Sequence, residues 1–313
     1  MERSRSPPSK RSWPVTPSAV PKRLEGKVAL VVGAGQTPGM TVGNGRAVAL
    51  LFAREGAKLM LADRSKEAVE DTCQQISEEF GLVPKTCTAD VSRESDCEAI
   101  VTATVQAYGR IDILHNNVGI AAGDKSAAEI SSDVYENIMR VNAGGALWLI
   151  KHVLPVMRSQ KSGVIINVSS IGSILTLPQG GGGGMAYKMA KAAMNNLTQN
   201  VAIENAKHGI RANAILPGLM ETPMSIERRT AVTAQAEGIS DEDARQKVRD
   251  ARNKQVPLRI GGQLSMGSAW DTANAALFLA SEEARFVTGV LLCVDGGQAV
   301  SQGCPIPERE RDS

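Results

Sequence analysis

The sequence predicts an α/β fold, in which helices cover both faces of a seven-stranded parallel sheet and form a three-layer sandwich within a single domain. Seven short apolar runs alternate with six longer segments that repeat apolar residues at helical spacing. Most of the short runs are apolar at consecutive positions, as in strands that are buried on both faces of a parallel sheet. The alternation contains no linker, so strand–helix–strand crossovers within one domain explain it.

The expected elements follow one another in regular order. The short apolar runs, which we interpret as strands, are Val28–Val32, Lys58–Ala62, Val83–Ala89, Ile113–Leu114, Val164–Val168, Ala212–Leu216 and Val290–Val294. The segments whose apolar residues recur every three or four positions, which we interpret as helices, are Arg46–Glu55, Lys66–Phe80, Glu94–Tyr108, Asp133–Met157, Ala186–His208 and Trp270–Ser281.

Residues 221–262 depart from this alternation, because they form a long excursion between the sixth strand and the last helix. Within it, Ser240 stands three residues before Asp243 at the start of a highly charged segment, which predicts a capped helix. Ligands of parallel sheets bind outside the carboxyl ends of the strands, so we expect the excursion to be a substrate loop or lid. Its arginines, at 228–229 and 245–252, are expected to face solvent.

The two ends of the chain differ from the body. Residues 1–23 are rich in serine and proline and carry six basic residues against Glu2, which predicts a disordered basic tail that is not a secretory signal. We therefore place the folded domain at residues 24–300 and a short C-terminal tail at 301–313.

Composition argues against several classes of function. The chain has three histidines and five cysteines without a CxxC pair, which argues against a metal site and favours a reducing, cytoplasmic location. No run of 18 apolar residues is present to span a membrane. The body carries a small net negative charge and the chain has only 3% aromatic residues, so we expect no nucleic-acid partner. His115, on an expected buried strand, is interpreted as a core residue.

The first strand leads into a glycine-rich segment, residues 33–45, that precedes the first helix. Glycines at this place permit a tight turn and let a pyrophosphate approach the helix N-terminus, as in Rossmann-type folds. A strict GxGxxG is absent. Because the helical pattern begins after Gly45 and not after Gly39, we assign the turn to Gly33, Gly35, Gly43, Asn44 and Gly45.

Asp63 ends the second strand, 18 residues after Gly45. A carboxylate there accepts hydrogen bonds from the adenosine ribose hydroxyls and repels a 2′-phosphate, which favours NAD(H) as the cofactor. Arg64 follows, and an arginine at this place can pair with a 2′-phosphate, which makes NADP(H) the alternative. A third interpretation is that Asp63 only caps the following turn.

Tyr187 and Lys191 lie four positions apart on an expected helix, so they share one face. A free phenol has a pKa of about 10, and a nearby ammonium favours the phenolate, which would make Tyr187 a general acid/base near neutral pH. Alone, such a pair is more often an ordinary surface pair. Here, however, polar or turn residues gather at neighbouring strand ends: Asn116, Asn117, Gly119, Asn142, Ser169, Ser170, Pro217, Gly218 and Thr222.

With these motifs in place, residues 25–300 resemble the short-chain dehydrogenase/reductase family. The resemblance is carried by the glycine turn, Asp63, Asp90–Val91, Asn116–Gly119, Asn142, Ser170, the Tyr187–Lys191 pair, Pro217–Gly218 and Val294–Gly297. It implies a nicotinamide-dependent oxidoreductase that interconverts a secondary alcohol and a ketone by hydride transfer.

The resemblance also implies roles for individual residues. Tyr187 would pass a proton to or from the substrate oxygen, Ser170 would hold that oxygen, and Asn142 would position a relay water. Lys191 would bind the nicotinamide ribose and lower the pKa of Tyr187. Further cofactor contacts are implied at the adenosine end for Asp90, Val91, Asn117 and Gly119, and at the nicotinamide end for Pro217, Gly218 and Thr222.

Three features depart from the family pattern, and one of them is Arg64, directly after Asp63. The glycine turn contains several extra residues, and the interval from Ser170 to Tyr187 is lengthened by roughly the glycine run Gly180–Gly184. Because that run can bulge outward, the two hydroxyls are still expected to meet.

The resemblance implies a homodimer or homotetramer, since relatives pack the helices that correspond here to residues 133–157 and 186–208. Apolar residues flank the expected nicotinamide end and favour a partly apolar carbonyl or alcohol substrate: Leu175, Met185, Leu219, Met220 and Met224. The rival interpretations are an NADPH-dependent ketone reductase of a biosynthetic pathway and a nucleotide-sensing or scaffolding protein on the same fold.

Overall fold

A computed structural model of the chain describes residues 22–175 and 184–301. The two predicted tails, apart from residues 22, 23 and 301, and most of the glycine run lie outside the described residues.

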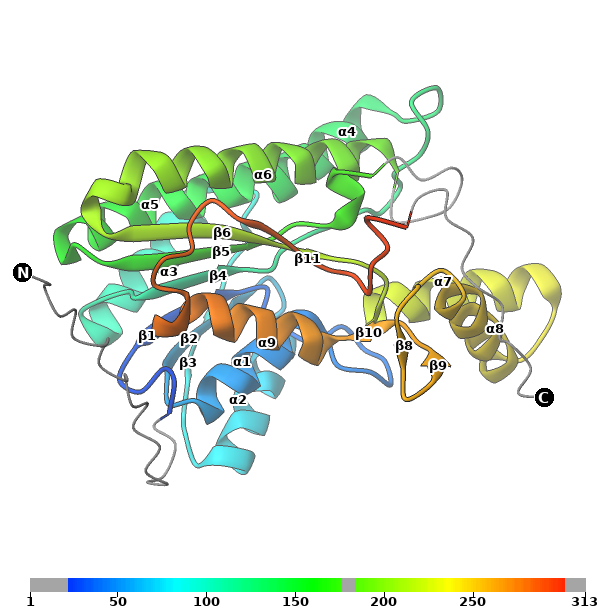
Figure 1. The fold of residues 1–313 in the computed structure, drawn as a ribbon, viewed down its shortest axis with the longest axis horizontal. Helices are drawn as coiled ribbons and strands as arrows, with labels where there is room; N and C mark the ends of the chain where they lie inside the picture. The colour runs from blue at the N-terminus through cyan, green and yellow to red at the C-terminus, as the bar shows by residue number, and fades with distance from the viewer. Residues whose placement is uncertain (1–21, 176–183, 302–313) are drawn as a thin grey trace, which may run out of the picture.

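The predicted seven-stranded parallel sheet is confirmed. Its strands lie in the order β11-β6-β5-β4-β1-β2-β3, and every neighbouring pair is parallel (Figure 1). Strand β3 begins two residues later than expected and β6 is longer at both ends. The bounds are β1 Val28–Val32, β2 Lys58–Asp63, β3 Lys85–Thr88, β4 Ile113–Asn116, β5 Gly163–Val168, β6 Ile210–Pro217 and β11 Leu291–Val294.

Helices cover both faces of this sheet, as Figure 1 shows. One face carries α1 Asn44–Arg54, α2 Lys66–Phe80 and α9 Ala269–Ala280, and the other carries α3 Glu94–Tyr108, α5 Gly145–Gln160 and α6 Met185–Asn205. Strand β1 illustrates why its sequence is continuously apolar. Ala29 and Val31 pack into the core under α1, whereas Leu30 and Val32 pack into the core under α3 and α5.

The expected helix Asp133–Met157 is not continuous. It consists of α4 Ser132–Met139, a π-helical segment Arg140–Gly144, and α5. Asn142 lies in the π-helical segment, and its side chain is buried. It accepts a hydrogen bond from the backbone N–H of Ile120 at 2.8 Å and donates one to the carbonyl oxygen of Ile120 at 2.9 Å. Apolar spacing alone does not distinguish such a π-helical turn from a regular helix, because both keep one face buried.

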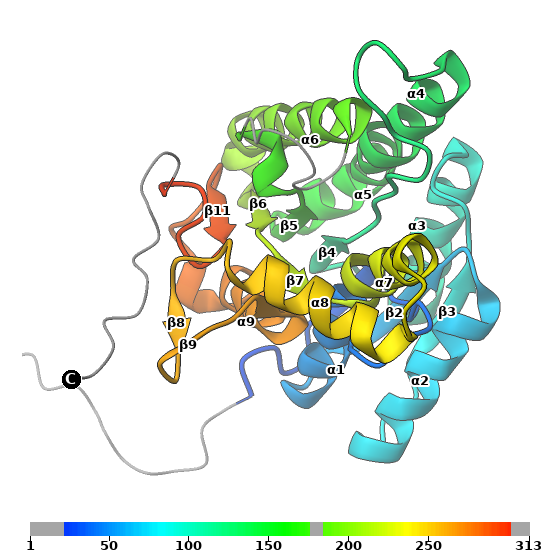
Figure 2. The same cartoon turned by 90° about the vertical axis from the view of Figure 1, so that its right-hand side faces the viewer.

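The excursion at residues 221–262 is a helical hairpin with short flanking strands. It contains α7 Pro223–Glu237 and α8 Asp241–Asn253, and the short strands are β7 Met220–Glu221, β8 Arg259–Ile260, β9 Gln263–Leu264 and β10 Gly267–Ser268. The predicted cap of α8 is confirmed, since Ser240 Oγ accepts from the Asp243 N–H at 3.1 Å. Figure 2 shows the hairpin in front of one end of the sheet.

The hairpin has its own small core and contacts the rest of the domain on two sides. Leu219, Ile226 and Val248 pack together with Val256 and Met266. Glu227 of α7 accepts a hydrogen bond from the N–H of Met40, in the extended glycine turn, at 3.5 Å. Arg228 donates to the carbonyl oxygen of Ala121, in the loop after β4, at 3.4 Å. Helix α7 therefore bridges the loops that follow β1 and β4.

The interpretation of His115 as a core residue is confirmed. Its side chain is fully buried, 6.2 Å from the Phe52 ring in an edge-on arrangement, and neither ring nitrogen has a hydrogen-bond partner among the described residues. Burial lowers the pKa of His115 to about 3. The imidazole is therefore neutral in the folded protein at every pH at which the fold is expected to persist.

We predict that His115→Leu makes the protein less sensitive to acid. The pKa is depressed in the folded state, so protonation of the unfolded chain removes stability as the pH falls from about 6.5 toward 3. When the pH is lowered from 7.5 to 5, the free energy of unfolding of wild type should therefore fall by about 2 kcal/mol more than that of the variant. Urea unfolding at both pH values tests this, with His208→Gln as control; equal losses in wild type and His115→Leu contradict it.

Candidate active site

Side chains from α6 and from the loop after β5 form the centre of the candidate site. Ser170 follows β5 and Tyr187 lies in the first turn of α6, and the Ser170 hydroxyl is near enough to the Tyr187 phenol to influence its pKa. The long interval between them in the sequence does not keep them apart. A carbonyl oxygen that lies against both hydroxyls can accept hydrogen bonds from both.

Lys191 lies one turn further along α6. Its side chain is 2% exposed, and Nζ donates to the carbonyl oxygens of Val168 and Val118 at 2.7 and 3.2 Å. Nζ also lies 5.8 Å from the centre of the Tyr187 ring. Gly119 leaves room for this ammonium, since a Cβ there would lie 3.1 Å from Nζ.

Burial is the largest influence on the pKa of both groups in this structure. It raises the pKa of the Tyr187 phenol above its ordinary range, while the hydrogen bond with Ser170 opposes that rise. It also lowers the pKa of Lys191 to about 7. The pKa of Tyr187 is therefore raised overall in this structure, and the role expected of Lys191 in lowering it stays a prediction.

Asn142 is held close to this centre by the loop after β4. The residue is 1% exposed, and its side-chain amide bonds to the backbone N–H and carbonyl oxygen of Ile120, next to Gly119. The π-helical turn orients Asn142. The bonds of Asn142 to Ile120 in turn fix the loop after β4, in which Gly119 lies next to Lys191.

The glycine turn brings β1, the loop after β4 and α1 into close contact. Gly33 adopts a φ of +80°, and a Cβ on Gly45 would overlap the Gly33 carbonyl oxygen. The same oxygen accepts a hydrogen bond from Asn117 Nδ2 at 3.0 Å. Helix α1 begins at Asn44, with Gly43 at its N-cap position and no side-chain cap. The assignment of Gly43 and Gly45 to the helix start therefore agrees with the geometry.

Gln36 supports the extra residues of the turn. Its Nε2 donates to the carbonyl oxygens of Thr37 and Thr41, and its Oε1 accepts from the Gly43 N–H, all at 2.9 Å. The insertion therefore forms a closed loop beside the N-terminus of α1 and does not displace it.

Asp63 lies at the end of β2, directly against the turn. Its Oδ2 accepts from the Gly35 N–H at 2.9 Å and its Oδ1 from the Ser65 N–H at 3.1 Å. A Cβ on Gly35 would lie 2.8 Å from the carboxyl group, so only glycine permits this approach. Both contacts come from backbone N–H groups, as the capping interpretation expects, and the contact of Asp63 with a ribose stays a prediction. Arg64 is exposed.

The remaining predicted contacts lie along the same edge of the sheet. Asp90 follows β3 and accepts from the Ser92 N–H at 2.9 Å, and Val91 is buried against Gly145 at the start of α5. Pro217 ends β6. Gly218 donates to the Val294 carbonyl oxygen at 2.9 Å, and Thr222 is buried just before α7.

Sequence reasoning missed Asp124. This carboxylate, in the loop after β4, accepts from the backbone N–H groups of Ala186 and Tyr187 at 3.2 and 2.8 Å and so caps the N-terminus of α6. Gly184, at the N-cap position, has no oxygen to do this, and a Cβ there would overlap the Asp124 carboxyl group. The only local signal was an N-cap position occupied by glycine, which does not identify a partner 60 residues away.

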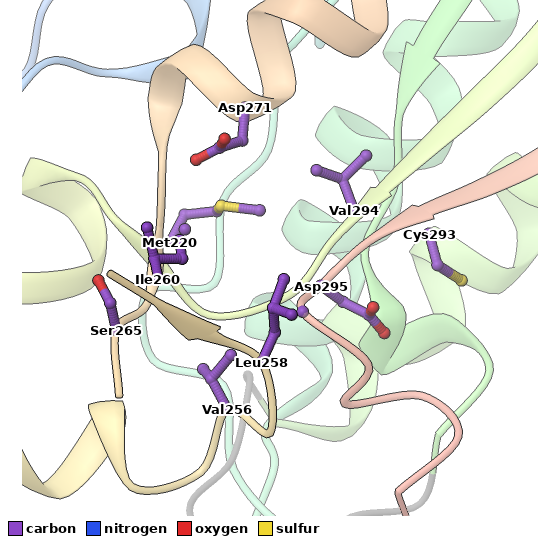
Figure 3. Close-up of a pocket in the computed structure, with 11 residues that line it drawn as sticks. Met220, Val256, Leu258, Ile260, Ser265, Asp271, Cys293, Val294 and Asp295 are labelled. Carbon is purple, nitrogen blue, oxygen red and sulfur yellow. The ribbon is translucent and has the colours of Figure 1, made fainter. Parts of the chain in front are cut away.

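A separate cavity of about 280 Å³ lies between β7, β10, β11 and the segment that follows α8. Figure 3 shows its mostly apolar wall, formed by Met220, Val256, Leu258, Ile260 and Val294. The carboxylates of Asp271 and Asp295 at its rim accept hydrogen bonds from their own loops. Ser170, Tyr187 and Lys191 do not line this cavity, so we do not assign the chemistry to it.

The family model described as enoyl-(acyl carrier protein) reductase matches residues 39–299 of the chain. The chain is a short-chain dehydrogenase/reductase. Members of this family are oxidoreductases that bind nicotinamide cofactors and act on CH–OH or C=O groups, so the predicted enzyme class is confirmed.

This dehydrogenase/reductase has well-covered relatives. It is 35% identical over 285 residues to (+)-borneol dehydrogenase 2 of Salvia officinalis, in an alignment that covers 90% of this chain and 92% of the relative. It is 32% identical over 280 residues to levodione reductase of Leifsonia aquatica, with 89% and 96% covered. The crystal structure of carveol dehydrogenase from Mycobacterium avium in complex with NAD matches at a TM-score of 0.76 and 27% identity, with 88% and 99% covered.

Two further observations concern the described residues of the dehydrogenase/reductase. Within residues 22–175 and 184–301, every helix is too short or too polar to cross a bilayer. In that part of the chain, no group of three or more His, Cys, Asp or Glu side chains is arranged to hold a metal ion.

We predict that Asp124→Ala destabilises the dehydrogenase/reductase by about 1 kcal/mol, because two first-turn N–H groups of α6 lose their acceptor. Gly184→Ser alone should also destabilise it, since the new Cβ meets the Asp124 carboxyl group. In the double variant the serine hydroxyl can replace the carboxylate as the cap. In urea unfolding, the double variant should then have a larger free energy of unfolding than Asp124→Ala. A double variant that is no more stable than Asp124→Ala contradicts the capping role.

Proposed function

We propose that the protein is an NAD(H)-dependent oxidoreductase that interconverts a secondary alcohol and a ketone, with Tyr187 as the general acid/base. The observation that carries this proposal is the convergence of Ser170, Tyr187 and Lys191 at the carboxyl edge of the sheet. A hydroxyl pair backed by a buried ammonium is an arrangement suited to proton transfer at an oxygen atom.

The glycine turn fits a dinucleotide. The first N–H groups of α1 have no side-chain cap. A pyrophosphate is the kind of group that such an open helix N-terminus binds. We assign its binding to Gly33, Gly35, Gly43, Asn44 and Gly45. The adenosine end is assigned to Asp63, Asp90, Val91, Asn117 and Gly119, and the nicotinamide end to Lys191, Pro217, Gly218 and Thr222.

When bound, a nicotinamide supplies or accepts a hydride. Tyr187 supplies the matching proton, because its hydroxyl lies beside Ser170, where a substrate oxygen can accept hydrogen bonds from both. In the direction of reduction, the phenol donates its proton to this oxygen as negative charge develops there. Since burial raises the pKa of Tyr187, the phenol holds its proton at neutral pH, which suits this direction. Asn142 positions the relay water in this scheme.

Asp63 supports NAD(H) over NADP(H). Its carboxylate accepts from the Gly35 N–H and so lies against the glycine turn, and a carboxylate at the end of the second strand of such a fold repels a ribose 2′-phosphate. Arg64, which is exposed, is the feature that supports the alternative cofactor.

A partly apolar substrate is supported by the exposed side chains of Met185 and Met224, which lie in the first turns of α6 and α7, whereas Leu219 and Met220 are buried. Relatives named for borneol, levodione and carveol support the same substrate type. Assembly as a homodimer or homotetramer stays a prediction; exposed Leu147, Met189 and Ile203 on α5 and α6 support it.

We predict that Tyr187→Phe lowers turnover by about 10²- to 10⁴-fold while NADH binding is retained, because only the transferable proton is removed. Tyr135→Phe, an exposed tyrosine on α4, is the matched control and should leave turnover unchanged. Stopped assays over a panel of ketones and secondary alcohols measure the first effect, and NADH fluorescence measures the second. Retained turnover in Tyr187→Phe would sink the assignment and favour the nucleotide-sensing alternative.

We predict that wild type binds NADH more tightly than NADPH, and that Asp63→Asn improves NADPH binding by about 10-fold because the repulsion of the 2′-phosphate is lost. Asparagine keeps an acceptor for the Gly35 N–H, so the turn should survive. Parallel fluorescence titrations measure both affinities, with Asp133→Asn as an exposed control. Tighter NADPH binding by wild type contradicts the cofactor assignment.

A further inference from the structure

Two arginines of the helical hairpin converge on one serine. Arg229 of α7 donates from Nη1 to the Ser225 carbonyl oxygen at 3.0 Å, and Arg252 of α8 donates from Nη2 to Ser225 Oγ at 2.8 Å. Ser225 lies in the first turn of α7, three residues after Thr222. The expectation that the arginines at 245–252 all face solvent is therefore wrong for Arg252, whose position depends on the packing of α8 against α7.

These two guanidinium groups have no acidic partner among the described residues, although their neighbours do. Arg245 pairs with Glu227 at 3.0 Å, Arg249 with Glu221 at 2.5 Å and Lys247 with Glu237 at 2.6 Å. Arg252, in contrast, is only 8% exposed and forms no ion pair with a described residue, and its Nε, like those of Arg245 and Arg249, is buried without a hydrogen-bond partner among the described residues. Arg229 is half-buried and bonds only to a backbone oxygen.

The charges of the two groups also repel each other. Burial, followed by the charge of Arg229, lowers the pKa of Arg252 to about 10. Burial, followed by the charge of Arg228, lowers the pKa of Arg229. A buried charge without a counterion is costly, and a second like charge beside it adds to that cost. An oxyanion bound between them would satisfy the free donors and relieve the repulsion.

We propose that Arg229 and Arg252 form a binding site for an oxyanion group of the substrate, such as a carboxylate. This inference rests on the proposed function, and it narrows the substrate to a partly apolar alcohol or ketone that carries one negative group. The position of the two arginines in the chain supports an anion site for the substrate. Ser225 follows Thr222 and the Pro217–Gly218 end of β6, which we assign to the nicotinamide end.

Direct binding tests the site independently of turnover. With the cofactor site saturated by NADH, inorganic phosphate is titrated into the protein by calorimetry. We expect saturable binding with one site, weakened about 10- to 100-fold by Arg229→Gln, since a charge-assisted hydrogen bond is lost. Arg252→Lys keeps the charge and should retain part of the affinity. Lys247→Gln removes one positive charge from the exposed side of α8 and should have no effect.

Turnover of a matched pair tests the substrate assignment. The probes are 4-oxocyclohexanecarboxylate and its methyl ester, which present the same ketone with and without a charge. We expect wild type to have a kcat/KM for the acid at least about 10-fold above that for the ester. Arg229→Gln should remove this preference through KM with little change in kcat, while Lys247→Gln should keep it.

The two arms separate failure of this inference from failure of the proposed function. Absence of saturable phosphate binding, or binding that Arg229→Gln does not weaken, overturns the site. Arg229-dependent phosphate binding without a preference for the acid overturns the substrate assignment and leaves a site for free inorganic anions. Arg229-dependent binding in a protein that reduces no ketone supports the anion site and counts against the proposed function.

Discussion

The buried ammonium of Lys191 connects the elements on which the site depends. It donates to the carbonyl oxygens of Val168, at the end of β5, and Val118, in the loop after β4, and so ties both strand ends to α6. Because Tyr187 lies one turn before Lys191 and Ser170 lies two residues after Val168, this single anchor brings the two hydroxyls together. Both side chains are buried, and this has an electrostatic consequence. Desolvation lowers the pKa of Lys191 and raises the pKa of Tyr187, because in each case it disfavours the charged form.

Backbone approaches at two other points complete this framework. Gly45 packs on the Gly33 carbonyl oxygen, which directs the N-terminus of α1 toward the end of β1. Asn142, in the π-helical turn, holds the backbone of Ile120 and thereby the loop that contains Gly119. The first contact needs a residue without a side chain, which is why glycine stands at position 45. The second needs a short side chain that both donates and accepts, which the amide of Asn142 provides. The extra residues of the glycine turn close on Gln36 and leave this geometry intact.

The helical hairpin adds a charged surface to an otherwise aliphatic domain. Two ion pairs join α8 to α7 and a third joins α8 to β7, and these pairs are partly exposed, so each contributes little to stability. Arg229 and Arg252 differ because they are withdrawn from water without a carboxylate. The hairpin also contacts the loops after β1 and β4 through Glu227 and Arg228, so its position is linked to both halves of the sheet edge.

Local periodicity was sufficient to predict the seven strands, the parallel sheet and the cap of α8, because each depends on residues that are close in the sequence. The motif set was sufficient for the family and for proposing Ser170, Tyr187 and Lys191 together. Only the tertiary structure decided the break at residues 140–144, the cap that Asp124 supplies to α6, the direction of the Tyr187 pKa shift and the burial of Arg252. Each of these depends on which groups from distant segments come together and how much water they exclude, and spacing along the chain does not encode that directly.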